Sequence, residues 1–175
     1  MPRGKYLIHK WLCIFFVYFS LGLASAFAQT SNEVSSFKWY RWNEGVNAVQ
    51  FSGKFMLIDV YTDWCGWCKK MDRDVYRHTQ VRQLLDAGFI PVKLNAESSS
   101  MVSNGGNQYT EQELSKMLNV ESYPTTLVFN SKFQLVSRFS GYREPDIFIR
   151  YLKYIRGKHY LDYSFNEYLE RGGDK

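Results

Sequence analysis

Two apolar runs of strand length stand out in the pattern of hydrophobic and polar positions along the chain. Residues 55–61 are apolar except for a single acid, Asp59, and residues 89–95 have a similar character. Continuous apolar runs of this length are typical of strands that are buried on both faces in an α/β sheet. Shorter apolar runs predict two more strands, joined by a turn, at residues 126–129 and 135–139.

Helical patterns separate these strands. Thr110 and Glu113 have the spacing of a capping box, and Pro145 opens a stretch with one apolar stripe. The predicted helices cover residues 43–52, 65–76, 79–87, 110–118 and 145–156. Residues 96–109, rich in Ser, Asn and Gly, are expected to form a long loop. Helices alternating with strands, followed by a β-hairpin and a last helix, predict an α/β fold with a mixed central sheet flanked by helices.

The amino-terminal 28 residues differ from the rest of the chain. A basic head is followed by an apolar run from Trp11, which ends in Ala26-Phe27-Ala28. These are the three parts of a secretory signal peptide, so we expect residues 1–28 to be removed and the protein to be periplasmic. The alternative is an uncleaved membrane anchor, because residues 11–28 are just long enough to span a bilayer. Either way the rest of the chain faces an extracytoplasmic space.

The part of the chain after this leader is the size of one domain. Residues 29–36 are polar and are expected to be a flexible lead-in. Residues 37–157 carry the predicted helices and strands, and residues 158–175 form an aromatic-rich extension that packs on the domain or follows it. We expect the protein to be a monomer.

Removing the leader also changes the charge. The leader holds three of the 22 Lys and Arg residues and none of the 17 Asp and Glu, so the 19 basic and 17 acidic residues that remain give +2. A nucleic-acid partner needs a clustered basic face, and no such run is present in the sequence. We therefore expect no nucleic-acid partner.

The cysteines point to chemistry rather than to structural cross-links. Cys13 lies in the leader, which leaves Cys65 and Cys68 as one C-x-x-C pair. Disulfide-stabilised exported domains spread several pairs over the chain, and this one does not. A first cysteine at the start of a helix is favoured as a thiolate, because the helix dipole lowers its pKa from about 8.5. Cys65 can then attack a disulfide, and Cys68 can resolve the product.

Zinc binding and a static disulfide are the structural alternatives for this pair. Zinc needs four ligands, and the chain after the leader offers only His78 and His159 besides the two cysteines. Neither histidine has the spacing of a common zinc motif. We expect no metal and no other cofactor.

The residues around the pair extend the evidence. Asp63-Trp-Cys-Gly-Trp-Cys-Lys69 resembles the active site of the thioredoxin superfamily, Trp-Cys-Gly-Pro-Cys-Lys. The resemblance covers residues 39–156 and implies a thioredoxin fold, with a β-hairpin after a cis-proline. Four family positions outside the motif are matched by Asp59, Lys93, Pro124 and Gly141. Within the superfamily the chain looks most like exported, periplasmic thioredoxin-related proteins.

The resemblance also implies catalytic roles. Cys65 would be the nucleophile and Cys68 the resolving thiol. Asp59 would accept the proton of Cys68, with Lys93 influencing it. In the structural alternative, Asp59 is a buried acid that only pairs with Lys93, and the two roles are compatible.

The same resemblance implies a substrate groove. Trp64, Gly66 and Trp67 would form its rim. Pro124, if cis, would hold the Tyr123 backbone ready to pair with an extended substrate, and the groove would be completed by Thr125 and Gly141. Trp67 stands where thioredoxin has proline, which affects the reduction potential. Since Trp67 has no positive charge to hold a thiolate, it favours a reducing or intermediate couple.

The sequence therefore predicts an extracytoplasmic thiol–disulfide oxidoreductase that reduces disulfide-containing protein substrates. A reductant in that compartment must be re-reduced, which implies a membrane electron donor. A disulfide isomerase or oxidase of the same fold is one alternative. A non-catalytic binding module with a passive disulfide is the other, although such a module does not need a buried proton acceptor like Asp59.

Overall fold

The computed structural model describes residues 37–173. The predicted signal peptide and lead-in, residues 1–36, lie outside the described residues, so both stay predictions. Among the described residues, every helix is too short or too polar to cross a bilayer.

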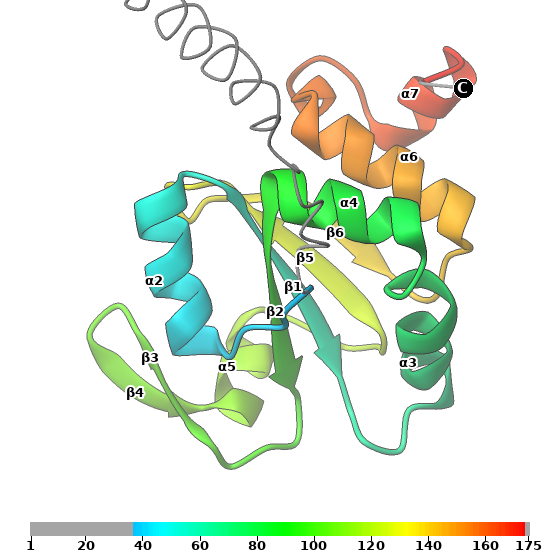
Figure 1. Ribbon diagram of the computed structural model, residues 1–175. Helices are drawn as coiled ribbons and strands as arrows, with labels where there is room; N and C mark the ends of the chain where they lie inside the picture. The colour runs from blue at the N-terminus through cyan, green and yellow to red at the C-terminus, as the bar shows by residue number, and fades with distance from the viewer. Residues whose placement is uncertain (1–36, 174–175) are drawn as a thin grey trace, which may run out of the picture. The chain divides into compact units, whose positions relative to one another are not determined.

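The centre of the domain is a four-stranded sheet in the order β2-β1-β5-β6 (Figure 1). The strands are β1 (Phe55–Tyr61), β2 (Phe89–Asn95), β5 (Thr125–Phe129) and β6 (Leu135–Ser140). β1 runs parallel to β2 and antiparallel to β5, and β6 pairs antiparallel with β5. This confirms the predicted mixed sheet. The bounds of β1 and β2 are those predicted, because most positions in both runs are apolar and buried.

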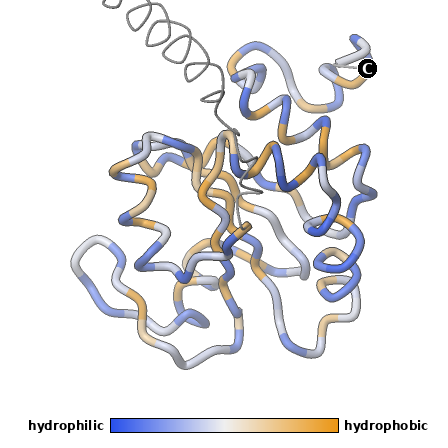
Figure 2. The backbone as a smooth tube through the Cα atoms, in the orientation of Figure 1, coloured by the Kyte–Doolittle hydropathy of each residue, from blue (hydrophilic) through white to orange (hydrophobic). Residues whose placement is uncertain are grey.

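Helices cover both faces of the sheet. One face carries α2 (Trp42–Ser52) and α5 (Glu111–Met117), and the other carries α4 (Thr79–Gly88) and α6 (Pro145–Arg156). Side chains alternate along a strand, so β1 serves two cores. Leu57 packs with α4 and α6, whereas its neighbours in β1 pack with α2 and α5. Figure 2 shows hydrophobic residues concentrated along the central strands.

The helix that follows β1 contains an irregular turn. It begins as α3 (Gly66–Lys70) and continues directly into a π-helical segment, η1 (Met71–Val75). In that segment the backbone N–H of Tyr76 donates to the carbonyl of Met71, 3.0 Å away. One helix was predicted over residues 65–76, and the structure adds a π turn in its second half. π turns are rare in proteins, and those that occur are often found at functional sites.

The segment predicted to be a long loop contains a β-hairpin instead. β3 (Met101–Asn104) pairs with β4 (Asn107–Thr110), and Gly105 and Gly106 form the turn between them with φ of +60° and +82°. Two consecutive positive φ angles suit glycine and match the twist of a tight hairpin. The loop prediction was wrong here because these short polar strands lack an apolar alternation. The hairpin is tied to α2 by the Trp42 indole, which donates to the Ser103 carbonyl at 2.8 Å.

The carboxyl-terminal extension packs on α6. It forms a short 3₁₀ helix, η2 (His159–Leu161), and a helix, α7 (Phe165–Glu170). The ring of Phe165 lies edge-on to Tyr151, 5.4 Å away, and the Tyr154 hydroxyl donates to the Tyr163 carbonyl. These contacts bury aromatic area on the side of the domain away from α2 and α5.

Candidate active site

Cys65 and Cys68 form a disulfide at the start of the helix that follows β1. Their Cα atoms are 5.3 Å apart, and Cys65 is the N-cap of α3. The loop from β1 to α3 lies at the lower edge of the domain in Figure 1, where β1 and β2 end. This is the strand-to-helix junction that the sequence predicts for the pair.

The local backbone favours negative charge on Cys65. The N–H of Cys68 donates to the sulfur of Cys65 at 3.0 Å, so one free amide of the first helical turn already faces that sulfur. Both cysteines are buried within the domain. Gly66, between them, is exposed, and a Cβ at this position would meet no atom within 4 Å. The surface at Gly66, between the two cysteines, is therefore open.

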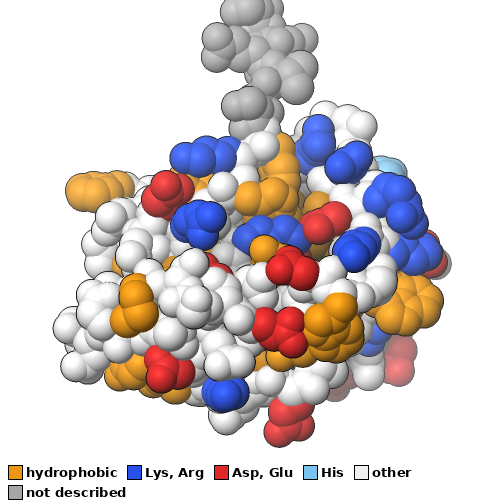
Figure 3. Space-filling view, turned by 90° about the horizontal axis from the view of Figure 1, so that it is seen from below, with side chains coloured by type: hydrophobic (Ala, Val, Ile, Leu, Met, Phe, Trp, Pro, Cys, Tyr) orange, Lys and Arg blue, Asp and Glu red, His pale blue; other side chains and the backbone are white. Residues whose placement is uncertain are grey.

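Two aromatic pairs flank the disulfide. The side chains of Trp64 and Trp67 are 67% and 59% exposed, far more than most large apolar side chains of the domain. Trp64 packs edge-on against Tyr123 with ring centres 6.1 Å apart, and Trp67 packs against Tyr142 at 5.5 Å. Figure 3 shows this end of the domain, with exposed hydrophobic side chains beside acidic ones. The Trp64 indole donates a hydrogen bond to the carboxylate of Glu97 at 2.9 Å.

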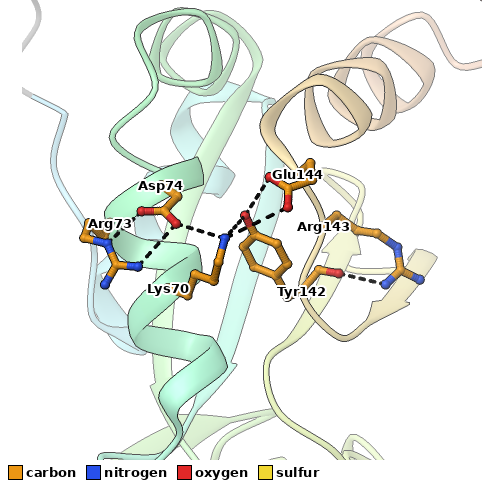
Figure 4. Close-up of polar contacts among 6 residues, drawn as sticks. All are labelled: Lys70, Arg73, Asp74, Tyr142, Arg143 and Glu144. Carbon is orange, nitrogen blue, oxygen red and sulfur yellow. Dashed lines mark hydrogen bonds and ion pairs between the residues drawn. The ribbon is translucent and has the colours of Figure 1, made fainter.

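Polar contacts hold Tyr142 in place (Figure 4). Its hydroxyl accepts from the ammonium of Lys70 at 2.7 Å and donates to Glu144 at 2.9 Å. Lys70 also pairs with Asp74 at 3.0 Å. The hydrogen bond with Tyr142, and to a smaller extent the one with Asp74, raises the pKa of Lys70. Sequence reasoning missed Tyr142, because it is brought to the site from 72 positions beyond Lys70. The only signal was its place directly after Gly141.

The other predicted groove residues come together where β5 begins and β6 ends. The Tyr123–Pro124 bond is cis, as predicted. Gly141 has a φ of +83°, and its N–H donates to the Pro124 carbonyl at 2.8 Å. Thr125 is buried, and its hydroxyl donates to the Ser122 carbonyl at 2.7 Å. This hydrogen bond of Thr125 holds the loop before β5.

Asp59 is completely buried in the middle of β1. It lies on the same face of the sheet as Leu57. This face packs against the helix formed by α3 and η1, which we call the active-site helix. One carboxylate oxygen accepts from the ammonium of Lys93 at 2.5 Å, and the other accepts no direct hydrogen bond from the described residues. Burial raises the pKa of Asp59, and the charge of Lys93 opposes that rise only in part.

A second carboxylate, on Asp72, shares the same lysine. Asp72 lies in the π turn, and its Oδ1 accepts from the ammonium of Lys93 at 2.5 Å. The ammonium also lies over the ring of Trp39, 4.6 Å from its centre. Burial alone would lower the pKa of Lys93, but Asp59 and Asp72 outweigh it and the pKa is raised. Sequence reasoning missed Asp72, although its place one helical turn after Cys68 was a usable signal.

The described residues contain no group of three or more His, Cys, Asp or Glu side chains placed to hold a metal ion. His78 is the N-cap of α4, and the ring of His159 packs on Tyr168 in the carboxyl-terminal extension. Both histidines therefore belong to other parts of the domain than the disulfide.

The class is defined by four features together: a C-x-x-C disulfide at the start of the helix after β1, a buried Asp–Lys pair, a cis-proline before β5, and a sheet of this order. These are the features of thioredoxin-fold thiol–disulfide oxidoreductases. The comparisons with known proteins agree. A family model described as a thioredoxin-like domain matches residues 42–156. The chain belongs to this thioredoxin-like family.

Named relatives fall in the same class. The chain is 31% identical over 111 residues to the thiol:disulfide interchange protein DsbD of Tatumella citrea, covering 62% of this chain and 18% of that protein. It is 23% identical over 143 residues to a protein disulfide-isomerase of Ricinus communis, covering 82% of this chain and 26% of the relative. The chain thus spans about a fifth to a quarter of the length of these relatives.

Solved structures agree on the fold. A thioredoxin from Thermus thermophilus superposes with a TM-score of 0.58 at 24% identity, covering 69% of this chain and 87% of that one. A thioredoxin-fold protein from Helicobacter pylori gives a TM-score of 0.56 at 21% identity, covering 69% and 80%.

Proposed function

We propose that this protein is an extracytoplasmic oxidoreductase that reduces disulfide bonds in protein substrates through the Cys65–Cys68 couple. The observation that carries the proposal is the position of the Cys65 sulfur. It sits at the start of α3, accepts a hydrogen bond from the Cys68 amide, and belongs to a motif whose two tryptophans are exposed. A relative named a thiol:disulfide interchange protein supports the reaction type.

The reaction proceeds in two exchanges. The Cys65 thiolate attacks one sulfur of the substrate disulfide, which forms a mixed disulfide and releases the other sulfur as a thiolate. Cys68 then loses its proton and attacks the sulfur of Cys65. The protein disulfide forms and the second substrate thiolate leaves. Two electrons pass from the protein dithiol to the substrate, and the departing thiolates take up two protons.

Asp59 is the proposed proton acceptor for Cys68. Its carboxyl is buried on the face of the sheet that the active-site helix covers, and one of its oxygens is free of direct hydrogen bonds among the described residues. A raised pKa, caused by that burial, brings the carboxyl closer to the neutral range in which a general base works best. Lys93 balances the charge that Asp59 carries before it takes the proton.

The aromatic pairs are the proposed substrate walls. Trp64 with Tyr123 forms one wall and Trp67 with Tyr142 the other, and Gly66 leaves the space between them open. Exposed aromatic faces bind apolar polypeptide segments at little entropic cost, because their side chains have few rotatable bonds. We therefore propose an extended, partly unfolded protein segment around the target cysteine as the substrate, bound by a monomer of this chain.

Export and the direction of electron flow rest on separate arguments. The sequence of residues 1–28 supports export, with an uncleaved anchor as the alternative, and a reductant outside the cytoplasm requires a membrane electron donor. Trp67 supports a reducing or intermediate couple because it offers no cation to hold a thiolate on Cys65. The named protein disulfide-isomerase relatives favour an isomerase as the second candidate function.

The reduction potential of the couple, equilibrated against glutathione, separates the two candidates. A reductase is expected near the value of thioredoxin, about −270 mV, and an isomerase near about −180 mV. A potential of about −180 mV or higher would contradict the reductase proposal. A couple that exchanges with neither glutathione nor thioredoxin would indicate a passive disulfide and a binding module.

Trapping assigns the two thiols. The Cys68→Ser variant is expected to accumulate mixed disulfides with substrate proteins, because attack is retained and resolution is lost. The matched Cys65→Ser variant should accumulate far fewer. Non-reducing electrophoresis of the two variants, incubated with the same unfolded disulfide protein, is the measurement. Equal trapping by both would reverse or remove the assignment of Cys65 as nucleophile.

A further inference from the structure

We propose that Asp72 is a positioning residue for the redox step, which shares Lys93 with Asp59 and so keeps the buried carboxyl an effective proton acceptor for Cys68. This inference rests on the proposed function, because it assigns the group that controls the acceptor of that same site. It concerns a residue outside the Asp–Lys pair that the sequence pattern indicated.

The shared lysine has a simple geometry. The carboxylate oxygens of Asp59 and Asp72 each lie 2.5 Å from the Lys93 nitrogen, so these two oxygens are within 5.0 Å of each other. One cation therefore serves two anions. The attraction that Lys93 offers Asp59 is opposed by the repulsion from Asp72, and both act on the protonation of Asp59.

Solvent treats the two acids differently. The side chain of Asp59 is 0% exposed and that of Asp72 is 42% exposed, with Lys93 between them at 19%. Asp72 and Lys93 line a cleft of about 340 Å³, together with residues Phe37, Trp39, Tyr76, Arg77 and Arg82. Water can therefore stabilise the charge of Asp72 but not that of Asp59. Two carboxylates share one lysine, and Asp59 is the one that no water stabilises. Asp59 is therefore the carboxylate that more readily takes up a proton.

The other groups that act on Asp59 do not replace Asp72. Tyr76, from the end of the π turn, and Tyr61, from the end of β1, both feel the charge of Asp59. Thr126 of β5 lies opposite Asp59 in the sheet and contacts the Tyr76 hydroxyl. Burial raises the pKa of both tyrosines, so they stay uncharged near neutral pH. Among residues 37–173, Asp72 is thus the acid whose charge acts on the Asp59–Lys93 pair.

The direct test is the titration of the Asp59 carboxyl by carbon NMR in the disulfide form. In Asp72→Asn, Lys93 interacts with Asp59 alone, so the Asp59 midpoint is expected to fall by about one pH unit. Asp74→Asn is the matched control. It removes the same charge from the same helix, but Asp74 pairs with Lys70 and Arg73 instead of Lys93. An unchanged or higher midpoint in Asp72→Asn, or an equal fall in the control, would overturn the proposal.

The conservative variant tests whether charge is the cause. Asp72→Glu keeps the carboxylate in reach of Lys93 and is expected to restore the wild-type midpoint. A midpoint in Asp72→Glu that equals that of Asp72→Asn would mean that the shape of the side chain matters and not its charge, which overturns the proposal. These titrations need no turnover, so they give an answer even if the protein reduces no disulfide.

The kinetic test uses the pH dependence of the second exchange, followed by release of substrate thiol from the preformed mixed disulfide. Asp72→Asn should move the acid limb of the profile to lower pH and reduce the maximal rate several-fold, because a weaker base accepts the proton of Cys68. In an Asp59→Asn background the same change should have no effect. An equal effect in both backgrounds would show that Asp72 acts on the cysteines directly, and the proposal would fail.

Discussion

Replacing Asp59 by asparagine is expected to stabilise the folded protein while slowing its chemistry. Asp59 is completely buried, and one of its oxygens has no direct hydrogen-bond partner among the described residues. Its ionised form is therefore costly. The substitution does not leave Lys93 unpaired, because Asp72 still accepts from its ammonium at 2.5 Å. Removing one member of such a buried charge cluster is expected to raise the free energy of unfolding near pH 8 by about 1–3 kcal/mol.

The sign follows from proton linkage. The pKa of Asp59 is raised in the folded state, so the folded protein holds this proton up to a higher pH than the unfolded chain does. Stability contributed by the protonated carboxyl is complete below the unfolded pKa of about 3.9 and is lost as pH rises through the folded pKa. Asp59→Asn has no proton to lose there. The difference between the two proteins should thus be small at acid pH and grow towards pH 8.

Urea unfolding of the disulfide form at pH 4, 6 and 8 measures this difference, with thermal melts as a second readout. A gain of about 2 kcal/mol corresponds to a rise of several degrees in Tm for a domain of this size. Asp162→Asn is the control, because Asp162 is an exposed acid in the carboxyl-terminal extension. The same variants are assayed for reduction of insulin disulfides between about pH 6 and 8, where the proton acceptor is expected to act.

Two results would refute this reasoning. If Asp59→Asn loses stability at pH 8, the acid is a structural partner of Lys93, and its ion pair outweighs its desolvation cost. If Asp59→Asn reduces insulin as fast as the wild type across this pH range, Asp59 is not the acceptor for the Cys68 proton. A gain in stability together with loss of rate is the combination that the geometry requires.

Two further predictions concern the surface of the site and the leader. Tyr142→Ala is expected to raise KM for a protein disulfide several-fold with little change in kcat, because its ring supports Trp67 in the groove wall and touches no reacting atom. Tyr142→Phe keeps the ring, loses only the hydrogen bonds of the hydroxyl with Lys70 and Glu144, and should change KM much less; a loss of kcat in either variant would contradict a purely binding role. Cleavage after Ala28 should give a mature protein that begins at Gln29, measured by intact mass, whereas a full-length membrane-bound product would identify the leader as an anchor.

Local features of the chain allowed much of the fold to be predicted. β1 and β2 were predicted with their observed bounds, because a strand buried on both faces reads as a nearly continuous apolar run. The capping box of Thr110 with Glu113 is present in the structure, since its partners lie three positions apart. The cis Tyr123–Pro124 bond followed from the family resemblance.

Other parts of the fold could not be predicted in this way. The β3–β4 hairpin was expected to be a loop, because its strands are polar and owe their position to the Trp42 contact with Ser103, 61 positions apart. The π turn in the active-site helix also leaves no hydrophobic pattern of its own, because it inserts one residue into a helix that is otherwise regular.

The sequence by itself determined the class of this protein, because the two cysteines, proposed as nucleophile and resolving thiol, and the start of the helix lie within four consecutive residues, 65–68. Only the tertiary structure decided which side chains surround that motif. Asp72 meets Lys93 from a neighbouring helix, and Tyr142 reaches Trp67 from the far end of β6. Backbone geometry links residues a few positions apart, but pairs 21 and 75 positions apart meet only after the sheet and its helices have packed.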